Sequence, residues 1–255
     1  MRDRVFKAQN YYIPTYKHVS LPVYQTYEFD FFRCVQFDER FYGKTVSELH
    51  RGNLRTCTGR YSKLFPNQKL SYWADSRKTA IAEVKKHGAK NDLLTFWAYD
   101  DASSFIPTVD NLECLTIIDG RKCGVQDLIN KIDNNEMISE KDQRLLEEIM
   151  ACRPDCLAYD SKAMAGGENF IFFEKGFYKL SLRSVRLRLG NTKKRYAEIG
   201  CAVTSDYVPF LEGYGEYFLP ILRKGQHKEY FQSEEYLSRK SNYKKYLKEK
   251  LNEIG

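Results

Sequence analysis

A tyrosine and a glutamate able to act on one substrate stand close together in the segment GRYSKLFPNQKLSYWADSRKTAIAEV, residues 59–84. Tyr72 lies where side chains alternate in character, which predicts a strand over 70–74. Glu83 lies in a predicted helix over 77–87, at the edge of its apolar stripe. A carboxylate at that edge is half-shielded by the fold and able to face a cleft.

The predicted helix has clear start and stop signals. Ser76 is a favourable N-cap, because its hydroxyl can accept a hydrogen bond from a backbone N–H of the first turn. Gly88 is a favourable stop, because glycine adopts the left-handed conformation that ends many helices. The apolar stripe consists of Ala80, Ile81 and Val84. These signals place Glu83 in the second half of a short helix.

Arginines suited to phosphate binding lie before the segment 59–84 and at its start. Arg33 lies in a predicted strand over 27–36 among aromatic and aliphatic residues, where an unpaired charge is costly to bury. It is either a partnered or snorkelling arginine of the core or a fixed donor to a diphosphate. Residues 40–69 carry many basic residues without periodicity and predict a loop with short turns. Within it, Arg60 is the residue we favour as a second phosphate ligand, since a guanidinium binds phosphate oxygens in pairs.

A third segment, CLAYDSKAMAGGENFIFF at 156–173, combines polar side chains with a glycine pair. A short strand leads to Ser161, Gly166 and Gly167 form a flexible turn, and a strand follows from Asn169. No base is placed beside Ser161 in the sequence. We therefore interpret Ser161 as a hydrogen-bonding residue and not as a nucleophile.

Three blocks in this order resemble the RES domain family. The blocks are FRCV at 32–35, the Gly-Arg turn with Tyr72 and the Ala-x-x-Glu of the helix, and the segment 156–173. The resemblance spans roughly 28–190. It departs from the family pattern at Thr58, where a glycine is usual, at Tyr61, where a Trp is usual, and at Cys34, where many members carry an aromatic residue.

The resemblance implies an ADP-ribosyltransferase-like fold and NAD as substrate. It implies catalytic roles for Glu83, Arg33 and Ser161: stabilising an oxocarbenium-like ribose, holding the diphosphate and hydrogen-bonding the nicotinamide ribose or amide. The residues that it implies for NAD binding are Arg60, Tyr72, Tyr61 and Asn169. Tyr72 would stack on or border the nicotinamide ring. A strand tyrosine buried in the core remains the alternative for Tyr72.

The expected fold class is α+β: an ADP-ribosyltransferase-like mixed β core with flanking helices, plus a mainly helical C-terminal extension. We expect an irregular N-terminal arm over 1–27, a RES-like catalytic domain over 28–190 and the extension over 191–255. Further strands are predicted over 93–98, 112–118, 157–159 and 180–189, and two helices within 124–152 around Ser139. The extension shows no resemblance to the family.

Composition narrows the class of protein. The 255 residues include 41 Lys+Arg against 34 Asp+Glu, a net charge of +7 that favours polyanionic or nucleotide partners. No apolar run approaches the length of a transmembrane helix, and the N-terminus lacks an apolar signal core. We therefore expect a cytoplasmic protein without membrane association. Its seven cysteines, an odd number, are expected to be reduced.

Common catalytic and metal motifs are missing from the sequence. It contains no Walker loop, GxGxxG, HExxH or Gly-x-Ser-x-Gly, and its four histidines show no ligand spacing. The spacings of Cys114, Cys123, Cys152 and Cys156 are unlike those of common zinc motifs. We therefore expect no metal, and the consumed cofactor that the resemblance implies is NAD.

The sequence leaves several alternatives open. The main prediction is an NAD glycohydrolase or phosphorylase that acts as a toxin or defence effector. A mono-ADP-ribosyltransferase that modifies a protein or nucleic acid would use the same residues, so the acceptor is undetermined. A nucleic-acid-binding module and a catalytically inactive interaction protein are further alternatives. Residues 233–254 predict a C-terminal helix with Tyr236, Tyr243, Leu247 and Leu251 on one side. This apolar stripe would be covered by the catalytic body, by a second copy in a homo-oligomer or by an inhibitory protein such as an antitoxin.

Overall fold

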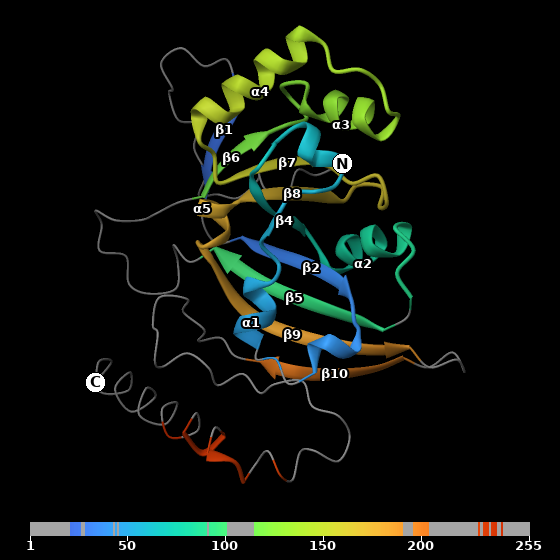
Figure 1. Ribbon diagram of the computed structural model, residues 1–255, viewed down its shortest axis with the longest axis vertical. Coiled ribbons are helices and arrows are strands. Elements are labelled where there is room, and N and C mark those ends of the chain that lie inside the picture. The colour runs from blue at the N-terminus through green and yellow to red at the C-terminus, as the bar shows by residue number, and fades with distance from the viewer. Residues whose placement is uncertain are drawn as a thin grey trace.

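The computed structural model describes residues 21–26, 29–42, 44, 46–90, 92–100, 115–190 and 196–203, with eight further residues between 229 and 241. In this part of the chain ten strands form one sheet in the order β1-β6-β7-β8-β4-β2-β5-β9-β10, with β3 beside β4 (Figure 1). The strands are β1 (Val23–Thr26), β2 (Asp30–Gln36), β3 (Arg55–Thr56), β4 (Lys69–Ala74), β5 (Leu93–Asp100), β6 (Leu115–Asp119), β7 (Cys156–Asp160), β8 (Glu168–Phe173), β9 (Leu180–Gly190) and β10 (Tyr196–Val203).

Short helices flank this sheet. They are η2 (Glu39–Phe41), α1 (Val46–Arg51), η3 (Arg60–Lys63), α2 (Arg77–Lys86), α3 (Val125–Asp133), α4 (Glu140–Cys152) and α5 (Glu174–Phe177). Helices α3 and α4 form the connection between β6 and β7, which are the parallel pair of the sheet. Parallel neighbours need such a crossover, whereas the other, antiparallel pairs do not. The mixed sheet and its helices confirm the α+β class.

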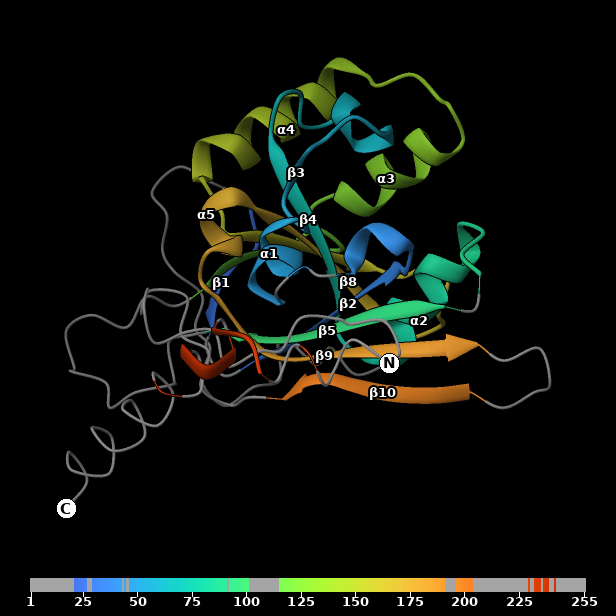
Figure 2. The ribbon, with the colours of Figure 1, turned by 60° about the horizontal axis from the view of Figure 1, so that its bottom comes forward.

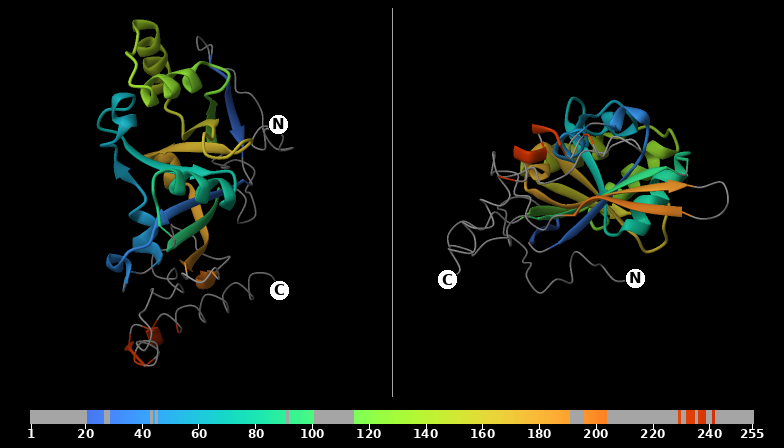
Figure 3. Two further views of the ribbon diagram at one scale, coloured as in Figure 1. Left: turned by 90° about the vertical axis from the view of Figure 1, so that its right-hand side faces the viewer. Right: turned by 90° about the horizontal axis from the view of Figure 1, so that it is seen from below.

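The helices gather at different places along the sheet. Figures 2 and 3 show α3 and α4 over the β6–β8 end, far from the β9–β10 hairpin. Helix α2 lies beside β2, on the strands in the middle of the sheet (Figure 1). This arrangement leaves α2 next to the ends of β4 and β8.

Apolar side chains cover both faces of the sheet. All six residues of β8 are buried. Phe170 and Phe172 pack edge-to-face on Phe31 of β2 at centroid distances of 5.1 and 4.9 Å, whereas Ile171 belongs to the cluster formed with α3 and α4. A strand buried on both faces loses the alternation of polar and apolar residues, which explains the run NFIFF.

The sheet is nearly divided between β4 and β2. These two strands are in register at one pair of residues, Phe32 opposite Ala74. The neighbouring pairs are longer: β4 pairs with β8 from Leu70 to Ala74, and β2 pairs with β5 over its whole length. Away from this pair the two strands separate in the middle of the sheet, and the backbone groups there need other partners.

Most predicted elements are confirmed. The helix after Ser76 covers Arg77–Lys86, and Ser76 accepts a hydrogen bond from the Thr79 N–H. Gly88 has the expected positive φ of 85°. Ser139 caps α4 in a reciprocal capping box with Asp142. The predicted strands within 28–190 are present in the described residues, with shifts of a few residues at their ends. Residues 112–114 of the strand predicted over 112–118 lie outside the described residues.

The basic segment 40–69 differs from the predicted loop. It contains α1, β3 and η3, and α1 buries Leu49 and His50 against the core. A helix of six residues is too short to show a periodic pattern, so its burial is decided by tertiary contacts.

The two ends of the chain also differ from their predictions where they are described. Within the arm predicted to be irregular, Val23–Thr26 form β1 and pair with β6. Within the extension predicted to be mainly helical, Tyr196–Val203 form β10 and pair with β9. The sheet therefore continues beyond residue 190. Residues 1–20 and most of 204–255 lie outside the described residues. None of the described helices has the length and apolar character required to cross a membrane.

Candidate active site

A cavity of about 430 Å³ opens where β2 and β4 separate. Strands β2 and β4, helix α2, the end of β8 and the segment 55–61 supply its walls. Most of its lining is apolar or aromatic, and its polar residues are Arg33, Asn53, Arg55, Thr56, Thr58, Glu83, His87 and Asn169. The candidate residues that line it are Arg33, Tyr61, Tyr72, Glu83 and Asn169. Five residues that are distant in sequence thus share one cavity, and its volume suits a small-molecule ligand.

Glu83 is held by two side chains from the far part of the chain. Ser161 Oγ donates a hydrogen bond to Glu83 Oε1 at 2.6 Å, and Asn169 Nδ2 donates to the same oxygen at 2.7 Å. Glu83 itself is half-buried on α2. No hydrogen bond within the described part of the chain uses Glu83 Oε2. The carboxylate is therefore oriented through one oxygen, and the other remains for a ligand.

Ser161 acts as a fixed donor. Its Oγ accepts hydrogen bonds from the backbone N–H groups of Ala163 at 3.2 Å and Met164 at 3.0 Å. A hydroxyl oxygen has two acceptor positions, and both are used. Its proton is thereby directed to Glu83, and no lone pair is left to attack a substrate. Ser161 does not itself line the cavity and reaches it through Glu83.

Arg33 spans the gap between the separated strands. Its Nη1 donates to the Tyr72 carbonyl of β4 at 2.6 Å, and its Nε donates to Asn53 Oδ1 at 3.0 Å. It thus takes over a β4 carbonyl at the place where the pairing of the two strands ends. Burial and the nearby charge of Arg55 lower the pKa of Arg33 to about 10, so the guanidinium stays charged at neutral pH. Nη2 makes no hydrogen bond with the described residues.

Tyr72 is both a core residue and a wall of the cavity. Its ring lies 5.4 Å from that of Tyr61, tilted by 31°, and its hydroxyl is 3.5 Å from Cys57 Sγ. Burial, followed by the contact with Cys57, raises the pKa of Tyr72, which keeps the phenol protonated. Tyr61 is buried and donates to the Tyr159 hydroxyl at 3.4 Å. The two rings form a continuous aromatic wall.

Arg60 begins η3, with Gly59 as its N-cap. Its side chain lies outside what the structure describes, so its predicted contact with phosphate stays a prediction. Gly59 and Tyr61 on either side of it line the cavity. Cys34 also lines the cavity, and burial raises the pKa of its thiol to about 12, which makes it an unreactive thiol.

Sequence reasoning missed Asn53, Arg55 and Cys57. All three line the cavity, and Asn53 orients Arg33. They stand in the basic segment 40–69, for which the sequence predicts a loop, and no spacing connects Asn53 with an arginine 20 residues earlier. The position of Asn53 between a short helix and a short strand is a weak signal of a site residue.

The described residues contain no group of three or more His, Cys, Asp or Glu arranged to hold a metal ion. Cys123, Cys152 and Cys156 form no disulfide within the described residues, and Cys114 lies outside them. Comparison with family models, curated proteins and solved structures finds no match to this chain. The resemblance to the RES domain family therefore rests on the sequence blocks alone.

Proposed function

We propose that this protein cleaves NAD at the bond between nicotinamide and ribose. The observation that carries the proposal is the Glu83 carboxylate, which is oriented by Ser161 and Asn169 at the wall of a cavity that also contains Arg33 and Tyr72. These are the residues that the RES resemblance selects from the sequence.

The chemistry requires a negative charge beside the ribose. Nicotinamide leaves as a neutral molecule, and positive charge builds up on the ribose ring as the bond breaks. Glu83 Oε2 can stabilise that charge, or hold a ribose hydroxyl, while Oε1 stays bound to Ser161 and Asn169. A carboxylate that is already oriented pays no reorganisation cost when the charge appears.

Other residues of the cavity are proposed to bind the diphosphate and the nicotinamide ring of NAD. Arg33 offers Nη2 to the diphosphate because Nε and Nη1 are committed to protein oxygens. Arg60 is proposed as a second diphosphate ligand. The Tyr61–Tyr72 wall offers an aromatic surface on which the nicotinamide ring can lie.

The fold and the biological role belong to the same proposal. We infer an ADP-ribosyltransferase-like core, supported by the mixed sheet that divides at a ligand-sized cavity. A RES-type NAD-degrading toxin would act in the cytoplasm and need an inhibitory partner. We propose that such a partner would bind the C-terminal segment 191–255.

The test is incubation of the purified protein with NAD, followed by chromatography of free nicotinamide and of the ADP-ribose product. Parallel reactions in plain buffer, with phosphate and with cell extract identify water, phosphate or a macromolecule as the acceptor. NADH is the matched control, because its reduced ring is a poor leaving group and should not be released. Intact NAD in all three reactions would refute the proposal. Binding of oligonucleotides in that case would support the nucleic-acid-binding alternative.

A further inference from the structure

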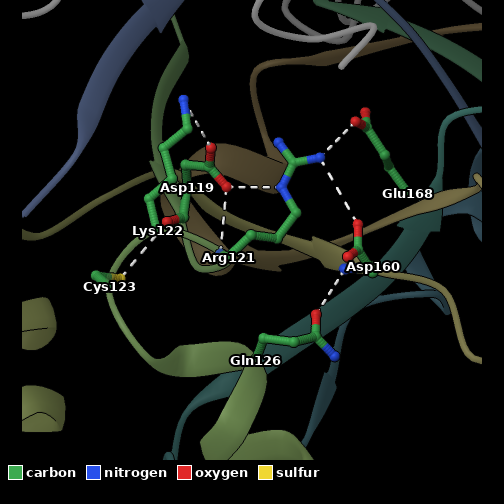
Figure 4. A network of polar contacts seen from close by, with 7 residues as sticks. All are labelled: Asp119, Arg121, Lys122, Cys123, Gln126, Asp160 and Glu168. Atoms are coloured by element: carbon green, nitrogen blue, oxygen red, sulfur yellow. Dashed lines mark hydrogen bonds and ion pairs between the residues drawn. The ribbon is translucent and has the colours of Figure 1, made fainter. Parts of the chain in front are cut away.

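Arg121 lies just after β6 and connects the ends of three strands. Its Nε donates to Asp119 Oδ1 at 2.7 Å, and its Nη1 donates to Glu168 Oε1 at 2.6 Å. Asp160 Oδ1 lies 3.8 Å from the same Nη1. Figure 4 shows the guanidinium between these carboxylates, with Gln126 accepting a hydrogen bond from the Asp160 N–H at 2.8 Å.

Two of these carboxylates are buried. Asp119 is fully buried and the Glu168 side chain is 4% exposed. Burial opposes the charge of Arg121, but the hydrogen bond and charge of Asp119 and the charge of Glu168 more than offset it, so the pKa of Arg121 is raised. Loss of this arginine would remove one ion pair from each of two buried carboxylates, although Lys122 Nζ would still lie 3.4 Å from Asp119 Oδ2. Breaking buried ion pairs in this way is destabilising.

Two residues of this network are the sequence neighbours of the two side chains that donate to Glu83. Asp160 and Glu168 are opposite each other across β7 and β8, and they precede Ser161 and Asn169 directly. Successive side chains of a strand point to opposite faces. Glu168 therefore turns towards Arg121 while Asn169 turns towards Glu83. The Glu168 carbonyl also accepts the N–H of Asp75, next to the cap of α2.

We propose that Arg121 is a positioning residue, which fixes the ends of the 160–168 connection so that Ser161 and Asn169 reach Glu83 together. The effect of Arg121 on kcat rests on the proposed function, whereas its effect on the distances from Ser161 and Asn169 to Glu83 does not. Gly167 shows how closely this connection packs: a Cβ added there would come within 2.7 Å of the Thr79 side chain on α2. A small displacement of the connection therefore changes the distance between the donors and the carboxylate.

The alternative is that Arg121 only stabilises the fold, and the chain offers a matched control. Lys179 Nζ contacts Asp155 Oδ2 at 2.8 Å, and both side chains are largely buried. Asp155 immediately precedes β7, and Asp160 is its last residue. Lys179→Met therefore removes a buried ion pair from the opposite end of the same strand.

The experiment compares crystal structures and NAD turnover of wild type, Arg121→Met and Lys179→Met. In Arg121→Met we expect the distances from Ser161 Oγ and Asn169 Nδ2 to Glu83 Oε1 to exceed about 3.5 Å. We expect kcat to fall by about 10- to 100-fold while the Kd for NAD stays within about twofold. Lys179→Met should keep both distances and kcat, with a lower Tm.

Retained distances in Arg121→Met would overturn the inference, and so would an equal loss of kcat in Lys179→Met. If Arg121→Met does not fold, Arg121→Lys replaces it, because one ammonium cannot hold Asp119 and Glu168 as the fork does. If wild type leaves NAD intact, the proposed function fails, and the two distances alone decide the role of Arg121.

Discussion

Replacing Glu83 with glutamine removes one negative charge from the cavity and keeps the length of the side chain. The amide oxygen can take the place of Oε1 and accept the hydrogen bonds from Ser161 and Asn169, which are 2.6 and 2.7 Å long in the wild type. The amide nitrogen then replaces Oε2 towards the ligand. Glu83→Gln is therefore close to a pure removal of charge.

The size of the effect follows from the lost attraction. Two unit charges about 4 Å apart interact by about 4 kcal/mol at an effective dielectric constant of about 20. Because the ribose carries only part of a charge in the transition state, we expect kcat to fall by about 100-fold or more, as for removal of one electrostatic stabiliser. Two hydrogen bonds change from charged to neutral, so the free energy of unfolding should fall by about 1–2 kcal/mol.

The assay is release of nicotinamide at saturating NAD, with the Kd for NAD measured by calorimetry. Transition-state stabilisation alone predicts a large loss of kcat with a small change in Kd. Glu147→Gln on the exposed face of α4 is the control, since it makes the same change away from the cavity. Wild-type turnover in a folded Glu83→Gln variant would refute the assignment.

Three further predictions concern the surroundings of the site and the end of the sheet. Arg33→Lys keeps the charge but cannot hold both Asn53 and the Tyr72 carbonyl, so the Kd for NAD should rise about tenfold or more by calorimetry, and an unchanged Kd would mark Arg33 as purely structural. Burial, then the charges of Arg33 and Arg51, lower the pKa of His50 from 6.5 to about 3. The unfolded chain therefore binds a proton that the folded protein does not, and stability falls as the pH falls from about 6.5 to about 3, at up to about 1.4 kcal/mol per pH unit. His50→Phe should flatten that dependence in urea titrations, and an identical pH profile would exclude His50 as its cause. Ending the chain after Gly190 removes β10 with the rest of residues 191–255 and exposes the edge of β9. The number of chains per particle in size-exclusion chromatography should then rise, and an unchanged number would contradict this role of β10.

Local sequence signals predicted most of the helices and strands around the site, but not the long-range contacts between them. Ser76, Gly88 and Ser139 mark helix ends because their own side chains or backbone conformations satisfy groups within a few residues. The short helix α1 and strand β3 escaped prediction because tertiary packing stabilises them. The 191–255 segment contributes a strand because β9 offers it a pairing edge.

By itself the sequence determined the residue types of the site and the elements that carry them: Arg33 on a strand, Tyr72 on the next, Glu83 on a capped helix, and Ser161 and Asn169 beside a glycine turn. Only the tertiary structure decided that Ser161 and Asn169, 78 and 86 residues from Glu83, both donate to one of its oxygens. It also decided that Arg33 uses two of its nitrogens on protein oxygens and that Arg121 holds the ends of β7 and β8. The physical reason is that a hydrogen bond depends on a position in space to within a few tenths of an ångström. Strand order and the separation of β4 from β2 set those positions, and no local pattern in the chain encodes them.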